Sequence, residues 1–197
     1  MAYIGKVPTA VPLGTSDLAD NIVTVDKLAT TLDLSGNTIT LPSGVGGKVL
    51  QVVHSENDYF QTTSSSTATD VLSASGTTWE TVITPSATSS KIIIASNLYT
   101  YWEYNGNSNN RGEIELHYKV GAGSYSELQA GQVGNYDYGG SGVQSRMRHS
   151  FHYQISPNTT SAVTVKFKFS SSGGATCVVN ESGNSDSNVT LYEVAGW

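Results

Sequence analysis

The stretch Glu113-Ile-Glu-Leu-His-Tyr-Lys-Val120 alternates between polar and apolar residues along its whole length. Because successive side chains of a β-strand point to opposite faces, it predicts a strand with one face in a core and the other in solvent. Runs of the same kind, separated by Gly, Ser, Asn and Pro, continue from Lys48 onward, which is typical of an antiparallel β-sandwich or barrel. The apolar face of the first run holds Ile114, Leu116, Tyr118 and Val120.

Two further runs predict which side chains are buried. In residues 145–155 the inward set is Met147, His149, Phe151, Tyr153 and Ile155, and the outward set is Arg146, Arg148, Ser150, His152 and Gln154. In residues 163–169 the inward set is Val163, Val165, Phe167 and Phe169, and the outward set is Thr164, Lys166 and Lys168. We expect Glu113 and Glu115 to face either the two arginines or the two lysines, in cross-strand pairs worth roughly a few tenths of a kcal/mol each.

The run Lys91-Ile-Ile-Ile-Ala-Ser-Asn-Leu-Tyr-Thr-Tyr-Trp102 differs because neither of its faces is consistently polar. A strand that is covered on both sides has this composition. In the sandwich of a single chain such burial is unusual, so the run indicates a subunit interface. The expected fold class is all-β, an antiparallel and jelly-roll-like β-sandwich.

Composition supports this fold and excludes several functions. The 197 residues (20.8 kDa) suffice for one core plus an appendage, and only 13% are charged, against about 25% in ordinary soluble proteins. Ten basic and sixteen acidic residues give a net charge of −6 without a basic stripe, so we expect no nucleic-acid partner. The sequence has no apolar run of about 18 residues and no signal-like start, so we expect neither membrane insertion nor conventional secretion.

Residues 1–45 differ in composition from the rest and contain three of the five prolines. Within them, residues 24–32 predict a short helix with Thr24 as its N-cap, and residues 34–42 alternate like a strand. This segment has too few apolar residues for its own core, and such segments gain order by packing against another chain. The expected parts are an attachment segment at 1–45 and a β-sandwich head domain at 46–197.

No motif for catalysis or cofactor binding is matched. Gly139-Gly-Ser-Gly-Val143 has valine where the serine-hydrolase elbow needs its last glycine. Residues 42–49 superficially resemble a phosphate loop, but Val49 follows Lys48 where Ser or Thr is required. The single Cys177 can neither close an intrachain disulfide nor supply zinc-site spacing. We therefore expect no enzyme activity, no cofactor and no metal.

The histidines and carboxylates form no chelating or acid–base pattern. His149 and His152 fall on opposite faces of one strand, so they do not bind a common ion. We expect His149 to be hydrogen-bonded in the core or an interface, with His117 and His152 in solvent. A small polysaccharide-degrading enzyme stays open as an alternative, because carboxylates from distant strands can converge. The carboxylates concerned, all expected at the surface, are Glu113, Glu115 and Asp186.

Aromatic residues gather beside two long polar loops, which we expect at residues 105–111 and 130–142. Loops on a rigid scaffold often carry binding sites. Tyr and Trp offer large rigid surfaces with a polar group, which suits recognition of a sugar or a protein. The candidate ligand-binding residues are the aromatics nearest these loops: Trp102, Tyr104, Tyr136 and Tyr138.

Several stretches together resemble one family. The N-terminal ones are Ala2-Tyr-Ile-Gly-Lys-Val-Pro8, Asp20-Asn-Ile-Val-Thr-Val-Asp-Lys-Leu-Ala29 and Leu32-Asp-Leu-Ser-Gly-Asn-Thr-Ile-Thr-Leu-Pro-Ser-Gly44. Two more occur at residues 82–94 and at Val189-Thr-Leu-Tyr-Glu-Val-Ala-Gly-Trp197. This set is similar to tail fibre proteins of marine bacteriophages, notably those of cyanobacteria. The resemblance covers the N-terminal quarter and scattered anchors beyond it.

The resemblance implies a virion protein, assembled in the host cytoplasm, that forms a homotrimer. Residues 1–45 would hold the subunits together and dock to the tail or baseplate, and the head domain would contact a host cell-surface glycan. Leu41-Pro-Ser-Gly44 leads almost directly into the head without a repetitive shaft, which favours a short fibre or tip component. The alternatives are a purely structural connector or decoration protein of the virion, and a secreted carbohydrate-binding module.

Overall fold

Two antiparallel β-sheets pack face to face in a computed structural model of the chain, which describes residues 49–103, 111–135, 144–181 and 186–196. The predicted β-sandwich is confirmed, because these residues form strands and turns without a helix. The helix expected at 24–32 and the strand expected at 34–42 lie outside the described residues. The division of the chain at residue 45 stays a prediction for the same reason.

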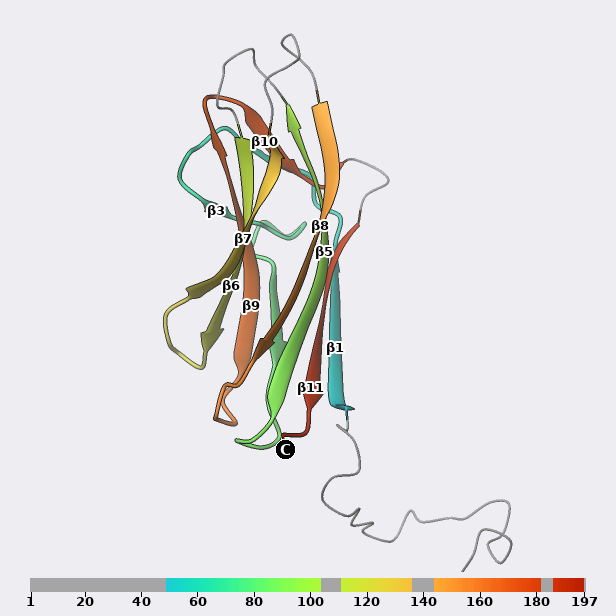
Figure 1. Cartoon of the computed structure of the whole chain (residues 1–197), viewed down its shortest axis with the longest axis vertical. Helices are drawn as coiled ribbons and strands as arrows, with labels where there is room; N and C mark the ends of the chain where they lie inside the picture. The colour runs from blue at the N-terminus through green and yellow to red at the C-terminus, as the bar shows by residue number, and fades with distance from the viewer. Residues whose placement is uncertain (1–48, 104–110, 136–143, 182–185, 197) are drawn as a thin grey trace, which may run out of the picture. The chain divides into compact units, whose positions relative to one another are not determined.

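The first sheet is built around one long central strand, β5 (Figure 1). Strand β8 pairs with β5 along one edge, while β11 and then β10 share its other edge. Strand β1 pairs with β11, and β2 pairs with β10. The strands are β1 (Val49–Asn57), β2 (Gln61–Thr63), β5 (Lys91–Glu103), β8 (Gln144–Ile155), β10 (Thr176–Val179) and β11 (Ser187–Val194).

The second sheet repeats this plan around β9, as the left half of Figure 1 shows. Strand β6 pairs with β9 on one edge and carries β7 beyond it, while β3 and β4 share the other edge of β9. The strands are β3 (Thr69–Asp70), β4 (Glu80–Ile83), β6 (Arg111–Val120), β7 (Ser126–Asn135) and β9 (Val163–Ser172).

The core lies between the inner faces of the two sheets. Every second residue of β5, from Ile92 to Trp102, is buried, and the residues between them are half-buried. Phe167 of β9 joins both layers, because its ring centroid lies 5.4 Å from that of Trp79 and 6.3 Å from that of Phe151. The alternation of the strands therefore supplies the apolar contact that holds the sheets together.

The predicted inward faces of β6, β8 and β9 are confirmed with one exception. Tyr153 is 37% exposed, because β8 is paired on one side only and its inward side chains are incompletely covered. Several predictions about the outer surface are wrong, among them that for Thr164, which was placed in the outward set but is 6% exposed. Lys166 was expected in solvent but is 7% exposed, since Asp70 of β3 and the Tyr125 ring cover its ammonium group. The polar loop expected at 130–142 begins later, because residues 130–135 continue β7.

A buried carboxylate ties the end of β11 to the connection between β4 and β5. Oε1 of Glu193 accepts hydrogen bonds from the backbone N–H and the hydroxyl of Ser86, both at 2.6 Å, and from the Ser90 hydroxyl at 2.7 Å. Burial raises the pKa of Glu193, but hydrogen bonds from Ser86, Ser90 and the Ala87 backbone outweigh it and hold the pKa below its usual value. Gly196 passes so close to Ser89 that a Cβ there would lie 1.9 Å from the Ser89 carbonyl oxygen.

We expect Glu193→Leu to lower the free energy of unfolding by about 2–3 kcal/mol, because the buried hydroxyl of Ser90 and the part-buried donors of Ser86 lose their acceptor. Glu193→Gln keeps an oxygen acceptor and should cost less. Since the native pKa of Glu193 lies below its unfolded value, its contribution is complete above the unfolded pKa and is lost as pH falls through the native pKa. Urea unfolding at neutral and acidic pH measures both effects, and an unchanged midpoint for Glu193→Leu contradicts them.

Candidate functional site

The structure describes one of the four aromatic residues that the sequence indicated. Trp102 is 2% exposed and belongs to the core, because it falls on the inward, even-numbered face of β5. A buried indole offers no face to a ligand, so Trp102 is a structural residue. Tyr104, Tyr136 and Tyr138 lie outside the described residues, and their role stays a prediction.

The odd-numbered face of β5 carries two other aromatics, Tyr99 and Tyr101, on the outside of the sheet. Antiparallel pairing with β8 sets Arg148 opposite Tyr99 and Arg146 opposite Tyr101. The guanidinium carbon of Arg146 lies 5.4 Å from the centroid of the Tyr101 ring, and that of Arg148 lies 5.6 Å from the Tyr99 ring. Two cation–π pairs therefore stand side by side on this face of the sheet.

A turn after β10 adds a carboxylate to this group. Asn180 has a φ of 59°, in the left-handed region that Asn tolerates better than most residues, and its buried amide donates to the Tyr59 carbonyl at 3.0 Å. The next residue, Glu181, accepts a hydrogen bond from the Tyr99 hydroxyl at 2.8 Å and from Nη2 of Arg146 at 2.9 Å. We use the name Tyr–Arg surface for the group formed by Tyr99, Tyr101, Arg146, Arg148 and Glu181.

The pKa values in this group follow from those contacts. Burial raises the pKa of Tyr99, and the hydrogen bond to Glu181 adds to the increase. Burial also raises the pKa of Tyr101, helped by the nearby charges of Glu103 and Glu181. The hydrogen bond from Arg146 lowers the pKa of Glu181, and the same bond raises the pKa of Arg146. At neutral pH the surface therefore presents neutral phenols, two cations and one anion.

Arg148 is the cation of this surface that faces solvent with the fewest protein partners. Its Nη1 donates to the Asp186 carbonyl at 3.2 Å, and its guanidinium stacks on Tyr99. Within the described ranges no carboxylate lies within ion-pair distance of Arg148, whereas Arg146 is neutralised by Glu181. Arg148 therefore keeps N–H donors for an external anion, held in place by the ring beneath it.

Sequence reasoning missed the two tyrosines although their signal was present. The outward direction of Arg146 and Arg148 was predicted correctly, and the parity that buries Trp102 turns Tyr99 and Tyr101 outward. The register between β5 and β8 decides which arginine lies opposite each tyrosine. This register is a property of the strand pair and cannot be predicted from either strand alone.

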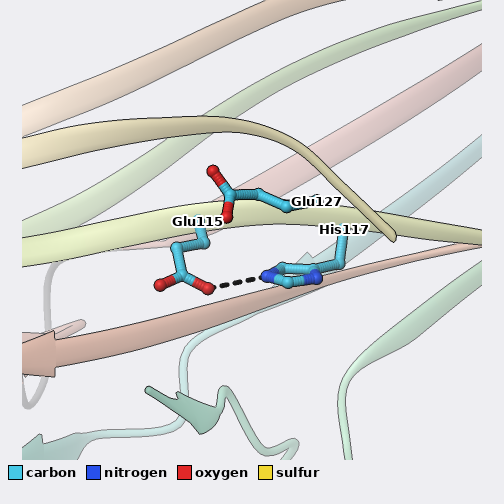
Figure 2. A group of neighbouring side chains, drawn as sticks. All are labelled: Glu115, His117 and Glu127. Atoms are coloured by element: carbon cyan, nitrogen blue, oxygen red, sulfur yellow. Dashed lines mark hydrogen bonds and ion pairs between the residues drawn. The ribbon is translucent and has the colours of Figure 1, made fainter. Parts of the chain in front are cut away.

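One group of side chains has the donor atoms of a metal site (Figure 2). Glu115 and His117 lie two residues apart on the outer face of β6, with 2.7 Å between Oε2 of Glu115 and Nε2 of His117. Glu127 of β7 lies opposite His117, and the three donor atoms are within 4.8 Å of one another. His117 was expected in solvent, but its side chain is only 12% exposed because these neighbours cover it.

Among the described residues, the carboxylates of the glycosidase alternative do not lie together. Glu113 and Glu115 belong to the second sheet and Asp186 leads into the first, so the core separates the carboxylates of the glycosidase alternative. The thiol of Cys177 is buried, and burial raises its pKa to about 12. Nε2 of His149 is buried without a hydrogen-bond partner in the described ranges, and burial lowers its pKa.

Comparisons with known proteins identify no family. No family model matches the sequence, and no curated protein is similar to it. Among solved structures, the TNF protein Eiger from S. frugiperda has a TM-score of 0.44 at 10% identity, over 76% of this chain and 96% of its own. The VP2 subviral particle of infectious bursal disease virus has a TM-score of 0.31 at 13% identity, over 85% of this chain and 48% of its own.

A third solved structure, the T13 particle of the same virus, has a TM-score of 0.34 at 11% identity, over 81% of this chain and 40% of its own. In the part of the chain that the structure describes, no helix is both long and apolar enough to cross a membrane. The comparisons indicate no function, so we infer one from the side chains of this chain.

We expect Glu181→Gln to lower the pKa of Tyr99, because the variant removes the charge that disfavours the phenolate. The pKa of Tyr101 should fall less, since Glu181 acts on it only as a more distant charge. A pH titration of ring ¹³C resonances in labelled protein measures both values, with Tyr99→Phe and Tyr101→Phe as assignments. Equal shifts at the two tyrosines contradict the hydrogen bond between Glu181 and Tyr99.

Proposed function

We propose that the protein is a structural component of a bacteriophage virion, a short trimeric tail fibre that binds an acidic glycan on the host surface. The observation that carries the adhesive role is the Tyr–Arg surface, where rigid aromatic rings and oriented guanidinium groups stand on one open sheet face. The N-terminal sequence stretches that resemble phage tail fibres support the place in the virion. In this function residues 1–45 attach the protein to the tail or baseplate.

The chemistry of the Tyr–Arg surface favours an acidic sugar polymer over a neutral one. The tyrosine rings hold the two guanidinium groups in place and add apolar area beside them. Arg148 supplies paired N–H donors in the fork that matches a carboxylate or a sulfate. Both arginines are exposed on the outer side of the sheet among the described residues, so the surface suits a polymer that passes across it. No bond is broken in this role, so neither catalytic residues nor a cofactor are required.

Weak binding by one chain is sufficient for adhesion when the protein is trimeric. Three copies on one fibre, and several fibres on one particle, raise the overall avidity by orders of magnitude without a tight single site.

The place of the subunit contact is proposed from an apolar patch at the start of β1. Val49 and Val52 are 52% and 53% exposed, and Leu50 is 40% exposed. Among the described strands β1 lies at the edge of its sheet, so the backbone groups on its outer side and these side chains are available to another chain. The patch follows residues 1–48 directly in the sequence, which suits a contact that continues from the trimerisation segment.

We expect the full-length protein to bind immobilised alginate, a polyuronate, and to bind neutral dextran much less. Arg148→Gln should weaken binding to alginate at least about tenfold, since a hydrogen-bonded charge pair contributes about 1.5–3 kcal/mol. Binding should also weaken as salt is raised. Biosensor titration at several salt concentrations measures these effects.

Lys119→Gln is the matched control, because Lys119 also lies over a tyrosine ring, 4.5 Å from the centroid of Tyr125, but on the second sheet. This variant should bind alginate as the wild type does. Equal binding of alginate and dextran contradicts the proposed ligand class. If Arg148→Gln dissociates the oligomer, the Tyr–Arg surface is a subunit contact. That result favours the alternative function, a purely structural connector or decoration protein of the virion.

We expect light scattering of the full-length protein to give a mass near three times 20.8 kDa. Val52→Glu should break the trimer, because it places a charge in the apolar contact. Val82→Glu should not, although Val82 is also exposed, at 46%, because it lies on β4 of the other sheet. A monomeric wild type contradicts the trimer, and a trimeric Val52→Glu variant contradicts the place of the contact.

A further inference from the structure

The Glu115, His117 and Glu127 group exists because of an irregularity in the pairing of β6 with β7. Ordinary antiparallel register continues to Leu116 opposite Gln129, but the next pair is His117 with Glu127, so Leu128 is an extra residue. In regular pairing Leu128 would lie opposite His117. The β-bulge turns Leu128 onto the core and sets the Glu127 carboxylate beside the imidazole.

The spacing of the donor atoms suits a single small cation. Two atoms that bind one tetrahedral Zn²⁺ at about 2.1 Å each lie roughly 3.4 Å apart. Oε2 of Glu115 and Nε2 of His117 are 2.7 Å apart, and the whole set is within 4.8 Å, so small rotations of the Glu115 side chain and of the exposed Glu127 side chain bring the donors to this spacing. Two of the donors belong to β6 and the third belongs to β7, which is paired with it.

The charges of the group also favour a cation. Glu115 has a partner in His117, whereas Glu127 makes no hydrogen bond or ion pair with any described residue. Two carboxylates and one neutral imidazole carry a charge of −2, which a divalent ion balances. Imidazole nitrogen with carboxylate oxygen is a ligand set for zinc and other first-row divalent metals.

The lysines on the same face do not occupy the position between the three donors. Lys166 lies opposite His117 in register, but its ammonium contacts Asp70 at 2.7 Å and lies 4.1 Å from the centroid of the Tyr125 ring. Lys119 also lies over Tyr125. Lys168 lies opposite Glu115 and opposes a bound cation by its charge, while Glu113, two residues before Glu115, favours one.

We propose that Glu115, His117 and Glu127 bind one divalent transition-metal ion of the zinc class, with water completing its coordination. The ion cross-links β6 to β7 across the bulge. Because this site lies on the second sheet, it is independent of the proposed adhesion through the Tyr–Arg surface.

The test uses full-length protein without a histidine tag, treated with EDTA and then dialysed. Titration with Co²⁺, followed by its visible absorption, and with Zn²⁺, followed by calorimetry, should each give one site per chain at about pH 7.5. Zn²⁺ should also raise the unfolding temperature, because it binds only the folded chain.

His117→Gln and Glu127→Gln should each weaken binding at least about tenfold, and Glu127→Gln retains the hydrogen bond between Glu115 and His117 as a check on folding. Lys168→Gln should strengthen binding by removing an opposing charge. His54→Gln is the matched control. His54 and Glu56 form the same two-residue pair on β1, with 3.2 Å between Nε2 and Oε1, but no third donor joins them in the described ranges.

Unchanged Co²⁺ binding in His54→Gln, together with its loss in Glu127→Gln, supports the site. Absence of a Co²⁺ absorption band and of heat with Zn²⁺ overturns it, as does equal loss in His54→Gln. Urea midpoints of the variants show whether each is folded. Unaltered alginate binding in His117→Gln separates this result from the proposed adhesion.

Discussion

The strict alternation along β5 is the constraint on which the rest of the sandwich depends. Every second side chain from Ile92 to Trp102 is sealed in the core, while β8 pairs with one edge of this strand and β11 and β10 share the other. A shift of β5 by one residue would bring its polar and tyrosine side chains into the core, so the registers of three neighbouring strands are coupled to a single buried face. Strand β9 has the same part in the second sheet, and Phe167 joins the two layers through Phe151 and Trp79.

The same alternation builds the outer surface of the first sheet. Because Trp102 must point inward, Tyr99 and Tyr101 must point outward, and the register with β8 supplies each with an arginine. The buried Asn180 turn then places Glu181 against Tyr99 and Arg146, which leaves Arg148 as the cation available to an external anion. The outward-facing residues of β5 and β8 thus form a polar and aromatic face. When several copies of the protein present this face together, many weak contacts add up to strong binding.

The two sheets use their outer faces differently, for physical reasons. On the first, guanidinium groups stack on tyrosines and remain in contact with solvent. On the second, Asp70 and Tyr125 cover Lys166, and a bulge in β7 brings a second carboxylate to His117. A cation or imidazole that is partly covered interacts more strongly with its partners than one in water. The outer face of the second sheet therefore suits a metal ion better, and the outer face of the first sheet is better suited to reversible binding of a polymer.

The sequence by itself determined the all-β class, the inward faces of β6, β8 and β9, and the absence of an intrachain disulfide, because these follow from local periodicity and from a single cysteine. Tertiary structure alone decided which strands are neighbours. That choice buried Lys166 beneath residues from β3 and the β6–β7 connection, set Arg148 beside Tyr99, and brought Glu127 to His117 through a bulge that no local pattern marks. Side-chain direction repeats every two residues and can be read from one strand, whereas pairing and register minimise the energy of the whole sheet and involve residues far apart in the chain.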